Sequence, residues 1–215
     1  MKKYLISVLL TSLLTHPFAF AGQDYVLDSP TRFIVDGFIS EKTVRDLNLA
    51  LQNNPKLREI EFRNSYGAPE NEITVTQAMI GLIEKNQLQT YAKGNCAFAC
   101  ATIFLMGEQP CLLIKSSGRA SRLILRPLVS RDGEFLKEET ELFFNKIVVH
   151  SKGKIPAIFL SWLYKVNDEL GALHIWSEVK SPAKYIQFQA NSKSEYENIS
   201  DLHPTDLGIR IANSE

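Results

Sequence analysis

Apolar and polar side chains alternate over residues 32–39, which predicts a β-strand, and Gly37 within it indicates the close approach of another backbone. Apolar residues at roughly helical spacing follow Ser40, a favoured helix N-cap, until the run 53–55 ends the helix. A second strand around residues 60–62 ends in a polar turn. The pattern therefore predicts a strand, helix, strand unit.

The alternation typical of strands and the apolar spacing typical of helices both continue along the chain. Residues 72–85 have the spacing of a helix that covers one face of a sheet, and residues 88–92 have that of a strand. Residues 97–106 are almost continuously apolar, which predicts a helix buried on most sides. Short strands are expected at 111–114 and 121–125. Strands that alternate with helices in this way predict an α/β fold.

The last third of the chain is less regular. We expect helices over residues 134–151 and 155–166, and a short closing helix near residues 203–207, where Pro and Asp suit a first turn. No internal repeat or low-complexity linker separates these segments from the rest. The sequence therefore predicts one domain over residues 22–215.

Residues 1–21 have the build of a secretory signal peptide. Lys2 and Lys3 precede an apolar run over residues 4–14, and small residues follow at the expected cleavage site. The apolar run is too short for a membrane span, which takes about 20 residues, and no later run is long enough either. We therefore expect cleavage after Ala21 and a periplasmic or secreted protein without an integral membrane span.

Charge and residue spacing exclude several classes of partner. The chain carries 24 basic and 24 acidic residues, so it has no net field that would recruit nucleic acid or an anionic membrane. No His lies within ligand spacing of any Cys, so we expect neither a metal site nor a cofactor.

The three cysteines allow one intramolecular disulfide in an oxidising compartment. Cys96 and Cys100 are four residues apart, and Cα atoms on adjacent helical turns lie about 6 Å apart, within disulfide reach. A bond from either residue to Cys111 is an alternative, and so are three buried thiols. The spacing favours the pair of Cys96 and Cys100.

Residues 94–107 have the build of an active-site elbow. Gly94 closes an extended run, and small residues lead directly into an apolar helix that Gly107 can end. Small residues on both sides of one protruding side chain are what a sharp strand-to-helix turn requires, because a larger Cβ substituent would clash there. The protruding residue of such an elbow is normally Ser or Cys, and here it is Phe98.

Four segments occur in an order that resembles one superfamily. They are residues 36–39, 60–68, the elbow, and 123–127. With these motifs the chain resembles the Clp protease proteolytic subunit and crotonase superfamily, and in particular its small secreted bacterial members. The resemblance covers residues 33–130 best. It implies a single-domain α/β fold, a ClpP/crotonase-like spiral of β-β-α units.

The resemblance also implies roles for individual positions. In the family a turn supplies an oxyanion-hole amide, which falls here on the backbone of Gly67 and Ala68, and the amide that follows the elbow residue belongs to Ala99. Phe98 stands in the place of the nucleophilic Ser, and Leu125 in the place of the basic His. Both members of the proton-transfer pair are therefore replaced.

A carboxylate that orients the His is the third catalytic group of the family. Asp168 falls about where this carboxylate is expected, with Glu169 as the alternative register. Such a carboxylate has no catalytic task without an imidazole. A surface acid at a helix end is therefore the simpler interpretation of Asp168.

The chain offers no replacement for the lost pair near the elbow. There is no Ser or Thr between Tyr91 and Ala101, and no His between His16 and His150. Thiolate catalysis by an elbow cysteine is disfavoured by the expected disulfide. The sequence therefore favours a protein without Ser–His catalysis over an enzyme.

The backbone amides of the predicted cradle do not depend on side-chain identity. A groove with such donors can take an extended peptide by strand addition. We therefore expect a pseudoenzyme of the cell envelope that binds a peptide or protein. The resemblance to the family also allows a homo-oligomer. The alternative is an active periplasmic serine-type hydrolase with a non-standard site. Acyl-coenzyme A chemistry is disfavoured, since that cofactor is not expected outside the cytoplasm.

Overall fold

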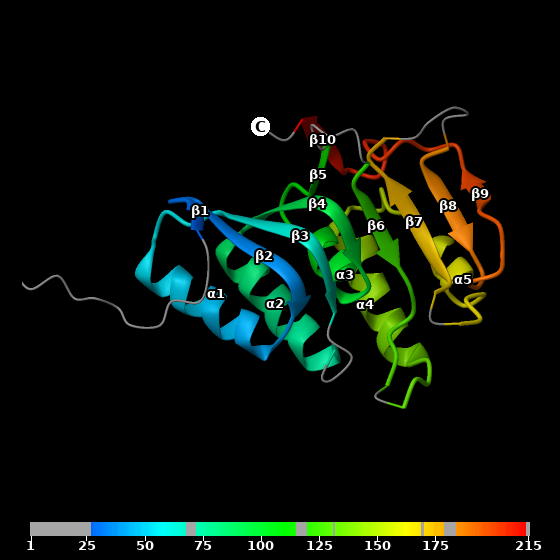
Figure 1. Ribbon diagram of the computed structural model, residues 1–215, viewed down its shortest axis with the longest axis horizontal. Coiled ribbons are helices and arrows are strands. Elements are labelled where there is room, and N and C mark those ends of the chain that lie inside the picture. The colour runs from blue at the N-terminus through cyan, green and yellow to red at the C-terminus, as the bar shows by residue number, and fades with distance from the viewer. Residues whose placement is uncertain are drawn as a thin grey trace, which may run out of the picture.

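The fold is organised around one mixed sheet of ten strands, seen in the computed structural model, which describes residues 27–67, 72–114, 120–130, 132–168, 170–178 and 184–213 (Figure 1). The strands are β1 (Leu27–Ser29), β2 (Arg32–Ile39), β3 (Glu59–Gly67), β4 (Gln89–Ala97), β5 (Cys111–Ile114), β6 (Arg122–Leu125), β7 (Ala172–Trp176), β8 (Ile186–Gln189), β9 (Glu197–Ser200) and β10 (Arg210–Asn213). The helices are α1 (Glu41–Asn53), α2 (Glu72–Asn86), α3 (Ala99–Leu105), α4 (Lys137–His150) and α5 (Phe159–Leu163). The α/β fold expected from the sequence is confirmed.

Three parallel strands, β2, β3 and β4, form the first half of the sheet, with α1 and α2 as their crossovers. Strand β4 then changes its partner. Its residues 91–93 pair with β5, and its residues 95–97 pair with β6. Gly94 lies between the two segments at a φ of +88°, a conformation that favours glycine. Strands β6 to β9 continue the sheet as antiparallel neighbours.

The core lies between the sheet and the helices, which pack on one of its faces (Figure 1). All seven residues of α3 are buried, as the continuous apolar run predicts. Helix α1 is amphipathic and buries Leu47 and Ala50. It begins at Ser40, whose backbone N–H donates to the Thr43 hydroxyl at 3.1 Å. None of the described helices covers the opposite face of β2, β3 and β4 (Figure 1).

Most regular elements up to residue 125 agree with the sequence pattern, although β4 is longer and α3 shorter than expected. The polar turn expected after the strand at 60–62 is wrong, because β3 continues through residues 64–67. Two expectations for the last third are wrong. The helix expected over 155–166 contracts to α5, and residues 204–208 form turns in place of a closing helix. The polar tail instead supplies β9 and β10, and β10 pairs with the distant β5. Pairing between distant strands leaves little local signal in a sequence.

Among the described residues, none of the helices combines the length and the apolar character needed to cross a bilayer. The expected signal peptide and its cleavage site lie outside the described residues.

Candidate functional site

The backbone turns sharply at Phe98, between the end of β4 and the start of α3. Phe98 has φ +62° and ψ −122°, which is unusual for a residue with a side chain. Its backbone N–H donates to the carbonyl of Ile124 in β6 at 2.8 Å. Its carbonyl accepts the N–H groups of Ala101 and Thr102 in the first turn of α3. These bonds fix the elbow and make its side chain protrude.

A disulfide spans the elbow. Cys96 in β4 and Cys100 in α3 are bonded, with Cα atoms 5.2 Å apart, so the favoured pairing is confirmed. Cys111 is a buried free thiol whose pKa is raised by burial. The cross-link joins the last residues of the strand to the first turn of the helix, and it therefore restrains the strained residue between them.

Gly67, the last residue of β3, lies against the start of α3. A Cβ atom at Gly67 would stand 2.6 Å from the Ala99 Cβ, 2.9 Å from the Glu72 Oε1 and 3.2 Å from the Ala99 nitrogen. Real Cβ atoms do not approach neighbours this closely, so only glycine fits. The structure thus brings together Gly67 and Ala99, two of the positions implied as amide donors. The third, Ala68, lies outside the described residues.

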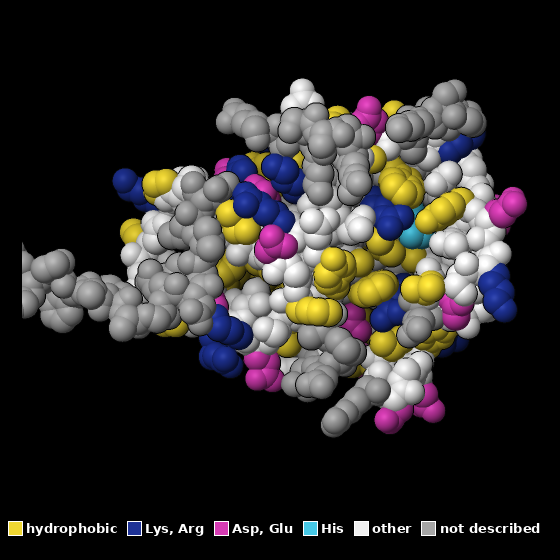
Figure 2. Space-filling view, in the orientation of Figure 1, with side chains coloured by type: hydrophobic (Ala, Val, Ile, Leu, Met, Phe, Trp, Pro, Cys, Tyr) yellow, Lys and Arg dark blue, Asp and Glu magenta, His cyan; other side chains and the backbone are white. Residues whose placement is uncertain are grey.

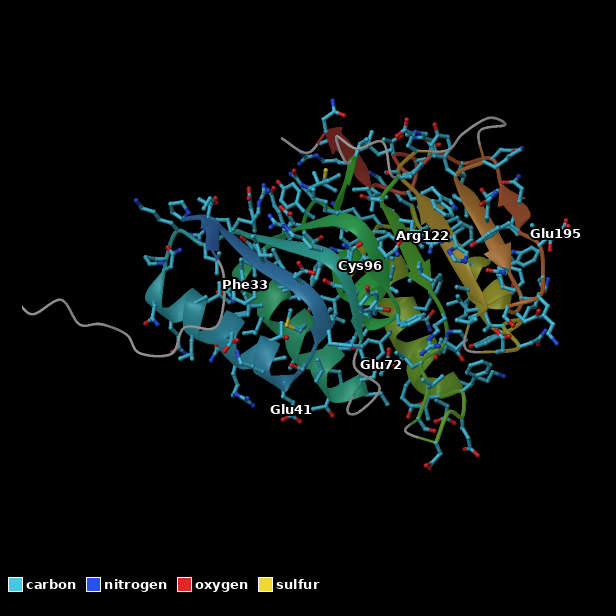
Figure 3. All side chains as sticks on the ribbon, viewed as in Figure 1. Phe33, Glu41, Glu72, Cys96, Arg122 and Glu195 are labelled. Carbon is cyan, nitrogen blue, oxygen red and sulfur yellow. A yellow bond between two sulfur atoms is a disulfide. The ribbon has the colours of Figure 1, made fainter. Side chains whose placement is uncertain are left out.

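A buried carboxyl group occupies the space beside these backbone groups. Glu72 lies at the start of α2 (Figure 3). Its side chain is only 5% exposed. Burial raises the pKa of its carboxyl group, while the Arg126 charge and backbone hydrogen bonds from Ala99 and Val129 oppose that rise. The Ala99 amide, the one that follows the elbow residue, therefore already interacts with an internal acceptor.

Arg126 covers the protruding side chain. Its guanidinium carbon lies 3.7 Å from the centroid of the Phe98 ring, the geometry of a cation–π contact. Leu125, the residue in the place of the family's His, is 2% exposed and belongs to the main core cluster. Alternation along the strand end thus turns Leu125 into the core and Arg126 towards the elbow.

The elbow borders an open cavity of about 390 Å³, here called the elbow groove. Glu72, Phe98 and Arg126 line it, and Phe38, Tyr66 and Leu170 supply apolar walls. Phe38 and Leu170 are 65% and 61% exposed. Figure 2 shows apolar side chains gathered on this face beside basic and acidic ones. Among the described residues, the groove thus combines an apolar surface with one buried carboxyl and one guanidinium group.

Asp168 is engaged in loop structure. Its Oδ1 accepts the backbone N–H groups of Leu170 and Gly171, both at 2.9 Å, and its Oδ2 accepts the N–H and hydroxyl of Ser192. The backbone bond from Ser192 is the main cause of the lowered pKa of its carboxyl group. Asp168 therefore ties two loops together. Glu169, the alternative position, lies outside the described residues.

None of the described histidines lines the elbow groove. The ring of His150 contacts the Gly107 carbonyl at 3.0 Å, next to a separate cavity of about 180 Å³. His174 is buried beside Trp176. His203 contacts the Thr205 hydroxyl at 2.8 Å, and neither residue of this pair lines the groove. The described residues thus bring no imidazole to the elbow.

The described residues also contain no group of three His, Cys, Asp or Glu side chains that could hold a metal ion. Phe98 was predictable because the small residues around an elbow are local in the chain. Glu72 and Arg126 were not predicted as site residues, since one reads as the first residue of a helix and the other as the end of a strand. Only their tertiary positions bring them to the groove.

Comparison with known proteins gives similarity at the level of solved structures. No family model and no curated protein matches the chain. The catalytic domain of the Plasmodium falciparum ClpP protease is similar at 16% identity and a TM-score of 0.49, covering 85% of this chain and 83% of that one. A ClpP1 mutant from Listeria monocytogenes is similar at 15% identity and a TM-score of 0.43, covering 68% of this chain and 82% of that one. Both of these similar structures are of ClpP proteins.

Proposed function

We propose that this chain is an exported ClpP-like protein that lacks Ser–His catalysis and binds a peptide segment in the elbow groove. The observation that carries the proposal is the protruding elbow residue, Phe98, with Arg126 over its ring. A phenyl group has no proton to exchange and no electron pair with which to attack a carbonyl carbon. The position that would perform acyl transfer is therefore chemically inert.

The surroundings of the elbow support the same conclusion. Acyl transfer needs a donor that is available to a developing oxyanion. The Ala99 amide interacts with the Glu72 carboxyl group, which lies against Gly67. A carboxylate at this place repels a developing oxyanion instead of stabilising it. Loss of the nucleophile and loss of the oxyanion site thus go together.

The shape of the groove supports binding. Phe38, Tyr66 and Phe98 come from the carboxyl ends of the adjacent parallel strands β2, β3 and β4, a common place for ligands in α/β sheets. Phe38 packs edge to face on Tyr66, with ring centroids 5.6 Å apart. Exposed aromatic side chains that are held in place lose little entropy when a partner covers them. An extended segment with apolar side chains suits such a surface.

Export is supported by the signal-like N-terminus and by the disulfide, since structural disulfides persist in oxidising compartments. N-terminal sequencing of the protein purified from its native envelope tests this part of the proposal. We expect the mature chain to begin at Gly22. A retained Met1 would contradict it.

Two measurements on the purified protein test the absence of catalysis and the presence of binding. A serine-directed fluorophosphonate should give no stoichiometric label, whereas labelling of a Ser would favour the alternative, an active hydrolase with a non-standard site. Selection from a displayed peptide library should enrich segments with apolar side chains. The Phe38→Ala variant, which removes an exposed wall of the groove, should lose this enrichment.

A further inference from the structure

We infer that Glu72 selects the ligand of the elbow groove, by accepting a backbone N–H of a bound extended segment through its Oε2 atom. The inference rests on the proposed function and names the chemistry of recognition. The ligand class is a neutral peptide backbone that carries an apolar side chain, and Glu72 is the residue that distinguishes it from an anionic ligand.

The first observation is an acceptor without a donor. The Oε2 of Glu72 is buried and has no hydrogen-bond partner among the residues that the structure describes, yet Glu72 lines the groove. Such an atom loses its hydration without compensation, and buried polar atoms in folded proteins normally have a partner. A ligand that carries a donor into the groove removes this cost, so ligand binding and satisfaction of Oε2 are coupled.

The charges that line the groove favour a neutral donor over a charged one. Arg126 lines the same groove, and its charge already acts on the Glu72 carboxyl group. A ligand ammonium would add a second positive charge to a mostly apolar site, without a second carboxylate among the described lining residues. A neutral N–H group donates to Oε2 without changing the net charge of the site. A ligand carboxylate is disfavoured at this position, because it only accepts hydrogen bonds and would leave Oε2 without a donor.

The apolar walls decide what accompanies the donor. Phe38 and Leu170 offer exposed apolar surface, and Tyr66 lies beside Phe38. In an extended segment, neighbouring side chains point to opposite sides. One apolar side chain can therefore contact this wall while an adjacent backbone N–H reaches Glu72. A peptide backbone provides both features in one ligand.

The experiment uses peptides with blocked ends, so that they carry no terminal charge. A peptide enriched by the purified protein is resynthesised with each amide in turn replaced by an ester, which removes one N–H and keeps the shape. Affinities are measured by fluorescence anisotropy for the natural protein and for Glu72→Gln. Glu84→Gln, an exposed position on the same helix, is the matched control, and thermal unfolding checks that each variant is folded.

We expect one ester position to weaken binding to the natural protein and to Glu84→Gln at least tenfold. The same ester replacement should not weaken binding to Glu72→Gln, because the side-chain amide can present a donor where the carboxylate presented an acceptor. Peptide binding with no sensitive position, or with equal sensitivity in Glu72→Gln, overturns the inference and leaves the proposed function standing. If no peptide binds the natural protein, the proposed function itself is overturned.

Discussion

The guanidinium group of Arg126 lies over the ring of Phe98, with 3.7 Å between the guanidinium carbon and the ring centroid. A contact of this kind contributes roughly 0.5–2 kcal/mol, depending on how far it is desolvated. It holds the protruding side chain of the elbow against the groove wall. A sharp strand-to-helix turn thus presents a phenyl ring, covered by a guanidinium group, at the edge of the groove.

This arrangement predicts that the Phe98→Ser variant stays inactive. A hydroxyl at position 98 would find Arg126 beside it, and no described histidine lines the groove to take its proton. Ester hydrolysis by Phe98→Ser should remain within about twofold of that by Phe98→Ala, because a competent Ser–His pair would add several powers of ten. Fluorophosphonate labelling gives a second readout. Rapid labelling of the new Ser would show that a base lies nearby.

The disulfide predicts a measurable loss of stability when it is removed. In the chain-entropy description, closing a loop of this size contributes about 2 kcal/mol, so Cys96→Ser and Cys100→Ser should each lower the free energy of unfolding by about that amount. Urea unfolding of the natural protein with and without reductant provides the comparison. Reductant should affect neither single variant. Cys111→Ser keeps the bond and should respond to reductant as the natural protein does.

The close packing around Gly67 predicts that alanine lowers stability at this position but raises it at Gly81. Gly67→Ala places a methyl group 2.6 Å from the Ala99 Cβ, so the start of α3 must shift, at a cost of roughly 1–3 kcal/mol. Gly81→Ala in α2 meets nothing within 4 Å, and alanine should stabilise that helix by about 1 kcal/mol. The midpoint temperature of thermal unfolding should therefore fall in Gly67→Ala and rise in Gly81→Ala. A Gly67→Ala protein as stable as the natural one would contradict the close packing at the end of β3.

The elbow was predictable because all its determinants are local. Gly94, the small residues that follow and the apolar run of α3 stand next to one another in the chain, and the disulfide links two of them. Leu125 was likewise placed at a strand end, in β6. Its burial depends on the alternation that turns Arg126 outward, which motif order does not determine. The register between β4 and β6 settles it.

The rest of the site depends on contacts between segments distant in sequence. Glu72 meets the elbow because α2 begins where β3 ends, beside Ala99. In the sequence it is one acidic residue in a first helical turn, which the helix dipole alone explains. Pairing of β10 with β5 also joins segments about a hundred residues apart. Periodicity cannot report such contacts, so the sequence predicted the fold class and a cradle at the elbow, but not the Glu72 and Arg126 side chains that line the groove.

His174 provides a prediction for acid stability. It lies in β7, is 3% exposed, and neither ring nitrogen has a hydrogen-bond partner among the described residues. Burial and then the nearby Arg122 charge lower the pKa of its imidazole from 6.5 to about 4. The folded protein thus holds His174 neutral at a pH where the unfolded chain binds a proton.

Because the unfolded state binds more protons in this range, the contribution of His174 to stability is complete above pH 6.5 and is lost as the pH falls towards 4. A shift of this size corresponds to about 3 kcal/mol. The free energy of unfolding, measured by urea at half-unit steps of pH, should fall less steeply between these limits in His174→Leu than in the natural protein. Equal slopes for the natural protein and His174→Leu would show that the imidazole is already protonated or hydrated in the fold.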